Sequence, residues 1–573
     1  MSNLFTDNPD MVFHFEKLDL AEITGLIEED YREYGEYSYA PKDYEDARDN
    51  YRKVLEIVGD IAGNVVAPRA AEVDEEGTHF ENGKVTYAGG TINSLKQLSK
   101  ADLMGMTLPR AYGGLNFPTS VYVMAVEMIS RADASLMNLF GLQDIGETVY
   151  KFGTDEQKAE FLPKLASGDY TGAMVLTEPD AGSDLQSVML QAQQDDEGNW
   201  YLNGMKRFIT NGCGHILLVL ARSEEGTKDG RGLSMFVCYG DDTVVVRRIE
   251  NKLGIHGSPT CELQFKNTPA QLVGKRKFGL IKYVMDLMNG ARLGISAQAL
   301  GISQAAYEEA LAYAKVREQF GQAIYHIPVV TNMLVDMRVT LEANRSLLYE
   351  TARWVDRRTQ FEELAARLKA AGKDAGEASK AHKEAVQMAA LLTPISKYTL
   401  SEAANQISDD ALQIHGGAGY MKEFPIERLV RDARITNIYE GTSQLQIVAA
   451  IGGVMKDILT DRFDEWDAKK YPGPLQKLTK TLSEIREISN DCREFVSERQ
   501  DKHFQEVSAK HLVDLYTILL CGYLLLDEAE LEGRKVFIAN RYITQGLAEA
   551  RQHQETIKSE QFADLVHADS ILI

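Results

Sequence analysis

Cysteine is scarce in this chain, and the few cysteines lie far apart. The sequence has five, at positions 213, 238, 261, 492 and 521, and no two of them form a CxxC pair. An odd number of widely spaced cysteines argues against a disulfide framework and against a zinc site, so we expect no metal. A reducing compartment fits this cysteine usage best.

Positive charge is also in short supply. The chain has 62 Lys and Arg against 85 Asp and Glu, which gives a formal net charge of −23 at pH 7. Nonspecific binding of nucleic acid requires a basic face, because the phosphate backbone supplies most of the affinity. The charge balance therefore argues against a nucleic-acid partner and against docking on anionic lipid.

Long apolar runs are missing as well. The stretch LYTILLCGYLLL at 515–526 is shorter than the 18 or more apolar residues of a membrane span. The N-terminal MSNLFTDNPDMVFHF lacks a basic leader region and a long apolar core, and it is acidic rather than Arg-rich. We therefore predict a soluble, cytoplasmic protein without a membrane span.

The residues that are present predict several domains. Hydrophobic residues make up 44% of the 573 positions, enough to bury a large core. An acidic, Tyr-rich extension (1–45) precedes a helical domain (46–170), in which Thr154 has the pattern of a helix N-cap. Short β-rich runs separated by turn signals predict a small antiparallel β domain at 171–275, and helical patterns return at 276–455 and 456–573. The predicted fold class is α+β, mainly α.

One acidic residue stands alone in RITNIYEGTSQLQIVAAIGG, residues 434–453. This residue, Glu440, lies between a tyrosine and Gly441, just before a predicted helix. Glycine at the second position allows a sharp backbone turn and leaves room for a ligand. Two interpretations are open from this stretch alone: a general base in an apolar pocket, or a helix N-terminal glutamate stabilised by the helix dipole.

Four stretches decide between these alternatives when they are taken together. They are LTEPDAGSD at 176–184, FITNG at 208–212, REQFGQAI at 317–324 and QIHGGAGYMKEFPIERLVRDARITNIYEGTSQ at 413–444. In this order, on an α–β–α layout, they closely resemble the acyl-CoA dehydrogenase family over residues 46 to 455. The flanking extension and C-terminal block look like those of longer members, such as the methylthiopropanoyl-CoA dehydrogenase-like group. The resemblance implies that residues 276–455 form a four-helix-bundle-type domain, followed by an added helical domain.

The resemblance assigns a reaction to this layout. Family members remove a proton from the carbon next to a thioester while the β-carbon gives hydride to FAD, which yields a trans-2-enoyl-CoA. Glu440 matches the family's base, and desolvation in a filled pocket raises the pKa of such a carboxylate. Some relatives take their base from the position of Ala291, which cannot act as one. The resemblance also implies β-oxidation and electron transfer to an electron-transfer flavoprotein.

The resemblance further implies which residues hold the ligands. The cofactor-binding set is Met174, Leu176, Thr177, Gly182, Ser183, Phe208, Thr210, Arg317, Gln319, Phe320, Ile324, Gln413, Gly417, Thr442 and Gln444. The substrate-binding set is Ser183, Asn289, Arg292, Tyr439, Glu440 and Gly441. In the family, the residues matching 317–324 come from a neighbouring subunit, although Arg317 could also be an ordinary surface arginine. We expect His256 and His415 to be structural.

Two alternative functions are weaker. An acyl-CoA oxidase would pass electrons to oxygen, but oxidases of this superfamily usually carry Asp where Thr442 stands. A nonenzymatic, nucleic-acid-binding flavoprotein of the same fold would need a basic C-terminal surface, which the acidic balance disfavours.

In the C-terminal block, Leu512, Leu515, Tyr516 and Leu519 recur at helical spacing and should be buried. We expect this block to replace the second dimer of tetrameric relatives, which predicts a homodimer.

Overall fold

Helices, one β-rich segment and further helices follow one another along the chain, and the predicted α+β, mainly α class is confirmed. The structure is a computed structural model, and it describes residues 2–559, 565 and 567–573. Within these, the chain divides into two compact units, 1–306 with 416–440, and 307–415 with 441–573. The finer domain boundaries expected from the sequence stay a prediction.

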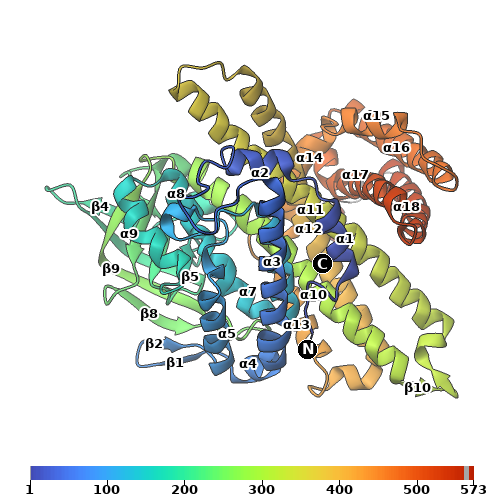
Figure 1. Cartoon of the computed structure of the whole chain (residues 1–573), viewed down its shortest axis with the longest axis horizontal. Coiled ribbons are helices and arrows are strands. Elements are labelled where there is room, and N and C mark those ends of the chain that lie inside the picture. Colours follow the sequence, from blue (N-terminus) through green and yellow to red (C-terminus); the bar gives the residue numbers. More distant parts are fainter. Residues whose placement is uncertain (1, 560–564, 566) are drawn as a thin grey trace. The chain divides into compact units, whose positions relative to one another are not determined.

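The first unit begins with helices and a short hairpin (Figure 1). The predicted N-cap is confirmed, because Thr154 Oγ1 accepts a hydrogen bond from Gln157 N and Gln157 Oε1 accepts one from Thr154 N. The helices are α1 (Pro9–Lys17), α2 (Ala21–Ile27), α3 (Tyr44–Ile61), α4 (Ala70–Glu76), α5 (Gly89–Lys100), α6 (Thr119–Ala132), α7 (Ala134–Gly141), α8 (Ile145–Phe152) and α9 (Asp155–Ala166). The hairpin strands are β1 (His79–Glu81) and β2 (Lys84–Thr86).

A seven-stranded sheet follows in the same unit. Its strands are β3 (Gly172–Val175), β4 (Gln191–Gln194), β5 (Trp200–Thr210), β6 (Ile216–Arg222), β7 (Leu233–Tyr239), β8 (Val244–Ile249) and β9 (Thr260–Val273). The order is β3-β6-β4-β5-β9-β7, with β8 paired to β9 and β6 also paired to β7. Most pairings are antiparallel, as predicted, while β3 and β4 each run parallel to β6.

Buried hydrophobic clusters lie on both faces of this sheet, because successive side chains of a strand point to opposite faces. On β6, Leu218 packs into a cluster with Phe161 of α9, and the next residue, Val219, packs into a second cluster with Phe236. Helix α13 (Ile426–Thr436) and the first part of α10 (Met285–Val316), through residue 306, complete the unit. Predicted site residues of this unit lie on the sheet and on α10, in the loop after β3, and in the segment that follows α13.

In the part that the structure describes, the second unit is helical apart from a two-stranded hairpin, β10 (Glu318–Gln319) and β11 (Gln322–Ala323). Its helices are the last part of α10, from residue 307, and α11 (Pro328–Ala370), α12 (Gly376–His415), α14 (Ser443–Met455), α15 (Thr460–Ala468), α16 (Leu475–Glu498), α17 (Lys502–Leu531), α18 (Lys535–Lys558) and α19 (Ala568–Ile571). The predicted apolar stripe of α17 is confirmed as buried, with Leu512, Leu515, Tyr516 and Leu519 each at most 1% exposed. Helices α11, α14, α16 and α18 of the same unit pack against α17.

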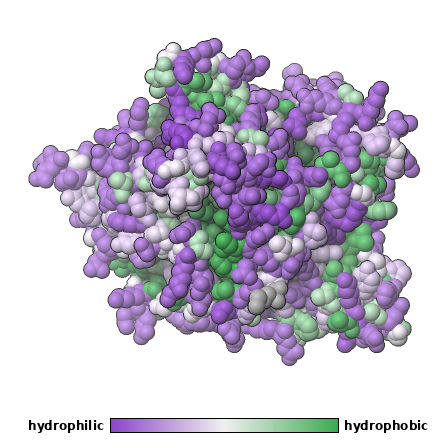
Figure 2. Space-filling view, viewed as in Figure 1, coloured by the Kyte–Doolittle hydropathy of each residue, from purple (hydrophilic) through white to green (hydrophobic). Residues whose placement is uncertain are grey.

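The surface drawn in Figure 2 is mostly hydrophilic, with apolar residues in separate patches. Within the described residues, none of the helices combines the length and the apolar character that crossing a bilayer requires. The same residues contain no group of three or more His, Cys, Asp or Glu that could hold a metal ion.

Candidate functional site

The predicted base, Glu440, lies just beyond the C-terminal end of α13 in a strained turn. Its φ angle is +53°, and Gly441 follows with φ +90°. Glycine adopts such angles freely, whereas a glutamate in the left-handed region is uncommon and needs support from its surroundings. The half-buried Glu440 is thus held in a backbone conformation that few residues other than glycine adopt.

Arg292 of α10 supports this turn. Its Nε lies 3.4 Å from the backbone oxygen of Glu440, and its Nη1 lies 3.4 Å from Asn289 Oδ1. Arg292 is 9% exposed, and burial lowers the pKa of its guanidinium, while attraction to the charge of Glu440 acts in the opposite direction. The structure therefore brings Glu440 next to Arg292, a predicted site residue 148 positions earlier in the sequence, which in turn contacts Asn289 on the same helix.

Tyr439 is tied to two buried amides that sequence reasoning missed. Its hydroxyl donates to Gln298 Oε1 of α10 and lies 3.3 Å from Asn138 Oδ1 of α7. Gln298 Nε2 in turn donates to Ala134 O at 2.8 Å and to Asn138 Oδ1 at 3.1 Å. Burial, reinforced by the charge of Glu440, raises the pKa of the phenol, which stays a donor at neutral pH. The residue before the base is thus fixed from two helices.

The flavin-binding residues expected on the β domain come together beside one another. Met174 lies on β3, with Leu176 and Thr177 directly after it, while Phe208 and Thr210 lie at the end of β5. Two bonds join the segments: Arg207 N donates to Thr177 O at 3.0 Å, and the wholly buried Lys206 donates through Nζ to Leu176 O at 2.7 Å. Burial lowers the pKa of Lys206 to about 8, against the attraction of Glu178 at 3.0 Å.

These segments present the groups that a flavin ring would need. Phe208 has φ +61° and is 50% exposed, so its ring stands out from the sheet. Among the described residues, the hydroxyls of Thr177 and Thr210 have no hydrogen-bond partner, and both residues are partly exposed. The guanidinium carbon of Arg207 lies 4.6 Å from the centroid of this ring. A half-exposed aromatic ring and free hydroxyls on neighbouring segments fit a planar heterocycle with a polar edge. Gly182 and Ser183 lie in the exposed loop after Thr177.

The predicted grip on the dinucleotide forms a hairpin in the second unit. Phe320 (φ +55°) and Gly321 (φ +76°) form the tight turn between β10 and β11, and the Phe320 side chain is 94% exposed. Within the described residues, no carboxylate pairs with Arg317, which leaves this exposed cation available for an anionic ligand. Gln319 is exposed at the same turn, and Ile324 is buried at its base.

Other predicted positions are distributed over both units. Gln413 is exposed near the end of α12, Thr442 is the N-cap residue of α14, and Gln444 is exposed in the first turn of α14. Gly417, exposed after α12, belongs to the first unit. A buried lysine missed in the sequence, Lys397 of α12, donates through Nζ to Gly441 O at 2.7 Å.

The two histidines set aside as structural make structural contacts. His256 bonds Asp74 Oδ1 at 2.9 Å through Nδ1 and Lys252 O at 2.9 Å through Nε2. The ring of His415 stacks on Tyr313 with centroids 4.3 Å apart, and burial lowers the pKa of its imidazole. Their lack of a catalytic role stays a prediction.

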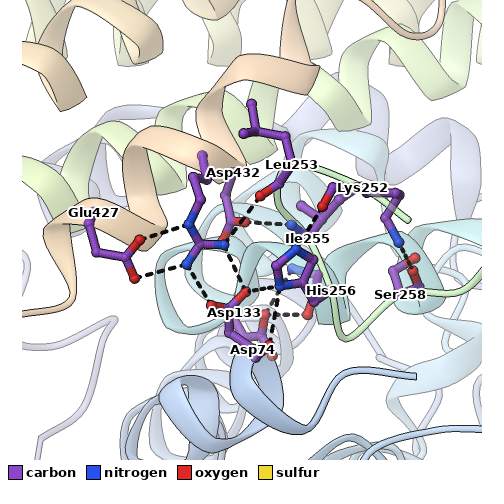
Figure 3. Close-up of polar contacts among 11 residues, drawn as sticks. Asp74, Asp133, Lys252, Leu253, Ile255, His256, Ser258, Glu427 and Asp432 are labelled. Carbon is purple, nitrogen blue, oxygen red and sulfur yellow. Dashed lines mark hydrogen bonds and ion pairs between the residues drawn. The ribbon is translucent and has the colours of Figure 1, made fainter. Parts of the chain in front are cut away.

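His256 belongs to a polar cluster that also holds α13 (Figure 3). Asp432 of α13, 3% exposed, accepts a hydrogen bond from Ile255 N at 2.5 Å. Arg431, the preceding residue, pairs with Asp74 at 2.6 Å and Glu427 at 2.7 Å. Burial raises the pKa of the Asp432 carboxyl to about 7, although the bond from Ile255 and the charge of Arg428 act in the opposite direction.

Comparison of the chain with models of known protein families finds one family along most of its length. Models of the acyl-CoA dehydrogenase N-terminal domain, middle domain and C-terminal domain match residues 48–169, 173–268, and 281–390 with 358–452. A further model, described as acyl-CoA dehydrogenase C terminal, matches residues 458–565.

Individual proteins that are similar to this chain carry names of the same family. An acyl-CoA dehydrogenase of Bacillus subtilis is 37% identical over 68% of this chain and 94% of its own length. A 3-methylmercaptopropionyl-CoA dehydrogenase of Ruegeria pomeroyi is 34% identical over 76% of this chain and 78% of its own. An acyl-CoA dehydrogenase from Bacillus anthracis, solved in complex with FAD, superimposes with a TM-score of 0.75 at 23% identity, covering 89% of this chain and 88% of its own. This last likeness shows a shared fold.

Proposed function

Since the chain belongs to the acyl-CoA dehydrogenase family, we propose that it oxidises an acyl-CoA thioester to the trans-2-enoyl-CoA with FAD as cofactor. The observation that carries the proposal is the strained turn at Glu440, held by Arg292 on one side and by Tyr439 and its buried amides on the other. A base at such a turn has a fixed position, which proton abstraction from a weakly acidic carbon requires.

Glu440 is the residue that takes the proton from the α-carbon of the acyl group, through its carboxylate. Arg292, which contacts the Glu440 backbone and is partly desolvated by burial, and its neighbour Asn289 would line the path of the substrate. The backbone N–H of Glu440 would donate to the thioester oxygen, because negative charge develops on that oxygen as the α-proton leaves.

Residues of the β domain would hold the flavin ring, with Thr177 and Thr210 on its polar edge and Phe208 against its face. The flavin, when bound, accepts the hydride that leaves the β-carbon. Arg317 and Gln319 of the exposed hairpin would bind the pyrophosphate and adenosine parts in a second copy of the chain, because an unpaired guanidinium suits a diphosphate. Thr442 and Gln444 complete the cofactor-binding set.

Electron-transfer flavoprotein is the proposed acceptor of the electrons, and β-oxidation the proposed setting. The name of the Ruegeria relative supports including a sulfur-containing acyl group among the candidate substrates. The acidic net charge of −23 continues to argue against a nucleic-acid-binding role.

Anaerobic titration with a panel of acyl-CoAs tests the proposal. The purified protein should be yellow, and one or more of butyryl-, isobutyryl-, octanoyl-, phenylpropionyl- and 3-methylthiopropanoyl-CoA should bleach its flavin absorbance. A protein that binds no FAD, or whose flavin none of these thioesters bleaches, would contradict the proposed reaction. Oxygen uptake as fast as flavin reduction would instead identify an oxidase.

A further inference from the structure

The loop at 250–259 joins two strands of the β domain and leads into the wall proposed for the flavin. It ends at β9, which pairs with β5 through Thr260↔Thr210 and Cys261↔Ile209. Asn211 N also donates to Pro259 O at 2.8 Å. A displacement of this loop would therefore be transmitted directly to the strand end that carries Phe208 and Thr210.

The same loop is locked to α13 at unusually close range. Gly254 has no space for a side chain: a Cβ there would lie 2.6 Å from the Arg431 carbonyl carbon and 2.7 Å from Asp432 Oδ1. Ile255 has φ +49°, an outlier for a β-branched residue, which the 2.5 Å bond from its N–H to Asp432 holds in place. A strained contact of this kind persists only where its neighbours over-determine it.

Further polar contacts surround the place where loop 250–259 meets α13 (Figure 3). Lys252 Nζ donates to Ser258 O at 2.6 Å and closes the loop on itself. The Asp74 carboxylate of α4 contacts both elements: its Oδ1 lies 2.9 Å from Nδ1 of His256 in the loop, and its Oδ2 lies 2.6 Å from Nη2 of Arg431 in α13. The loop and the helix thus share one support.

A second tie connects the loop to the residue next to the base. Asn138 Nδ2 lies 3.5 Å from Ser258 Oγ in the loop, and Asn138 Oδ1 lies 3.3 Å from the hydroxyl of Tyr439. The segment from Asp432 to Tyr439 is therefore linked to the loop at both of its ends.

We propose that Asp432 is a positioning residue that sets the base, Glu440, against the flavin wall by locking loop 250–259 to α13. The inference rests on the proposed function, in which the α-proton and the β-hydride leave adjacent carbons. Base and flavin wall must then keep one fixed separation, and errors of an ångström are costly. The Asp432–Ile255 bond directly joins α13, which leads to the base, to the loop, which leads through β9 to the strand end with Phe208 and Thr210.

Four variants of the full-length, FAD-loaded protein test the link. Asp432→Ala deletes the acceptor, whereas Asp432→Asn keeps an oxygen of the same reach. Gly254→Ala pushes the loop off α13 while Asp432 stays in place. Glu28→Gln is the matched control: Glu28 is a 2% exposed carboxylate of the same unit that pairs with Arg110 at 2.7 Å, remote in sequence from loop and base.

Two readouts separate positioning from general destabilisation. Stopped-flow reduction by butyryl-CoA, or by whichever thioester of the panel bleaches the wild type, gives the limiting rate and the apparent Kd. Hydrogen–deuterium exchange of segments 250–259 and 437–440 reports the lock without any substrate. We expect Asp432→Ala and Gly254→Ala to lower the limiting rate about ten- to a hundredfold with FAD content and Kd little changed. Both should speed exchange in both segments, while Asp432→Asn stays within about threefold of wild type and Glu28→Gln resembles it.

Several results would overturn the inference. Reduction of Asp432→Ala at the wild-type rate would show that the lock does not position the base, as would an equal loss of rate in Glu28→Gln. Faster exchange in 250–259 alone would show that the loop is not coupled to the base segment. If no thioester bleaches the wild type, the proposed function fails, and the exchange experiment still decides whether the lock exists.

Discussion

Replacing Tyr439 with phenylalanine probes how the base is held. The ring stays, and only the hydroxyl that donates to Gln298 Oε1 and approaches Asn138 is lost. Gln298 is wholly buried and Asn138 is 6% exposed, so water has little access to replace the lost donor. The Gln298 oxygen would then be a buried acceptor whose hydroxyl donor is gone.

The cost follows from that loss. Leaving a buried neutral acceptor unsatisfied costs about 1–3 kcal/mol, more than the net value of an ordinary hydrogen bond. For a large domain, each kcal/mol lowers Tm by about 2–4 °C, so Tyr439→Phe should melt roughly 2–12 °C below wild type. The turn at Glu440 loses one of its two supports in the first unit, and flavin reduction should slow by about tenfold.

Thermal melting of the FAD-loaded protein and stopped-flow reduction measure the two effects. Tyr112→Phe is the matched control, because Tyr112 is partly buried in the same unit and its hydroxyl has no hydrogen-bond partner among the described residues. That control should melt with the wild type. Equal Tm values for Tyr439→Phe and wild type would refute the argument, since the buried contact would then contribute nothing.

Three further outcomes are expected. Arg317→Ala should weaken FAD binding about ten- to a hundredfold, by loss of a charge-assisted pair worth about 1.5–3 kcal/mol, and unchanged affinity in a titration of the apo-variant would remove Arg317 from the cofactor site. Asp432, which faces Arg428, Asp74 and Asp133, has its pKa raised from 3.8 to about 7. The contribution of the protonated Asp432 carboxyl to the free energy of unfolding is fully present below pH 3.8 and is lost as pH rises through 7, by at most about 1.4 kcal/mol per pH unit. Asp432→Asn should flatten this slope in melts between about pH 5 and 8, and a slope equal to wild type would assign it to other groups. Light scattering should give about twice the chain mass of 63.9 kDa, and a tetramer would contradict the predicted homodimer.

Short-range features of this protein were predictable from the sequence, because their signals lie within a few residues. The Thr154 cap and the buried stripe of α17 follow from local spacing. The glycine after Glu440 predicts the turn, but it does not predict that the glutamate itself has a positive φ angle.

The supports of the site could not be predicted in this way. Gln298 lies 141 residues before Tyr439, and Ile255 lies 177 residues before Asp432. Glutamine inside a helical pattern and isoleucine in a loop carry no local signal for such contacts. A β-branched residue with positive φ runs against intrinsic preference, so only the tertiary contact explains it.

The proton-abstracting role of Glu440 is the central claim, and anaerobic flavin reduction by Glu440→Gln tests it most directly. The amide keeps the shape of the side chain and the backbone N–H but cannot take the α-proton, and Glu440→Asp serves as the control that retains a carboxylate. With a thioester that bleaches the wild type, Glu440→Gln should keep its FAD and bind the thioester, yet be reduced about a hundred- to ten-thousandfold more slowly. Reduction of Glu440→Gln at a rate near that of wild type would show that another group is the base.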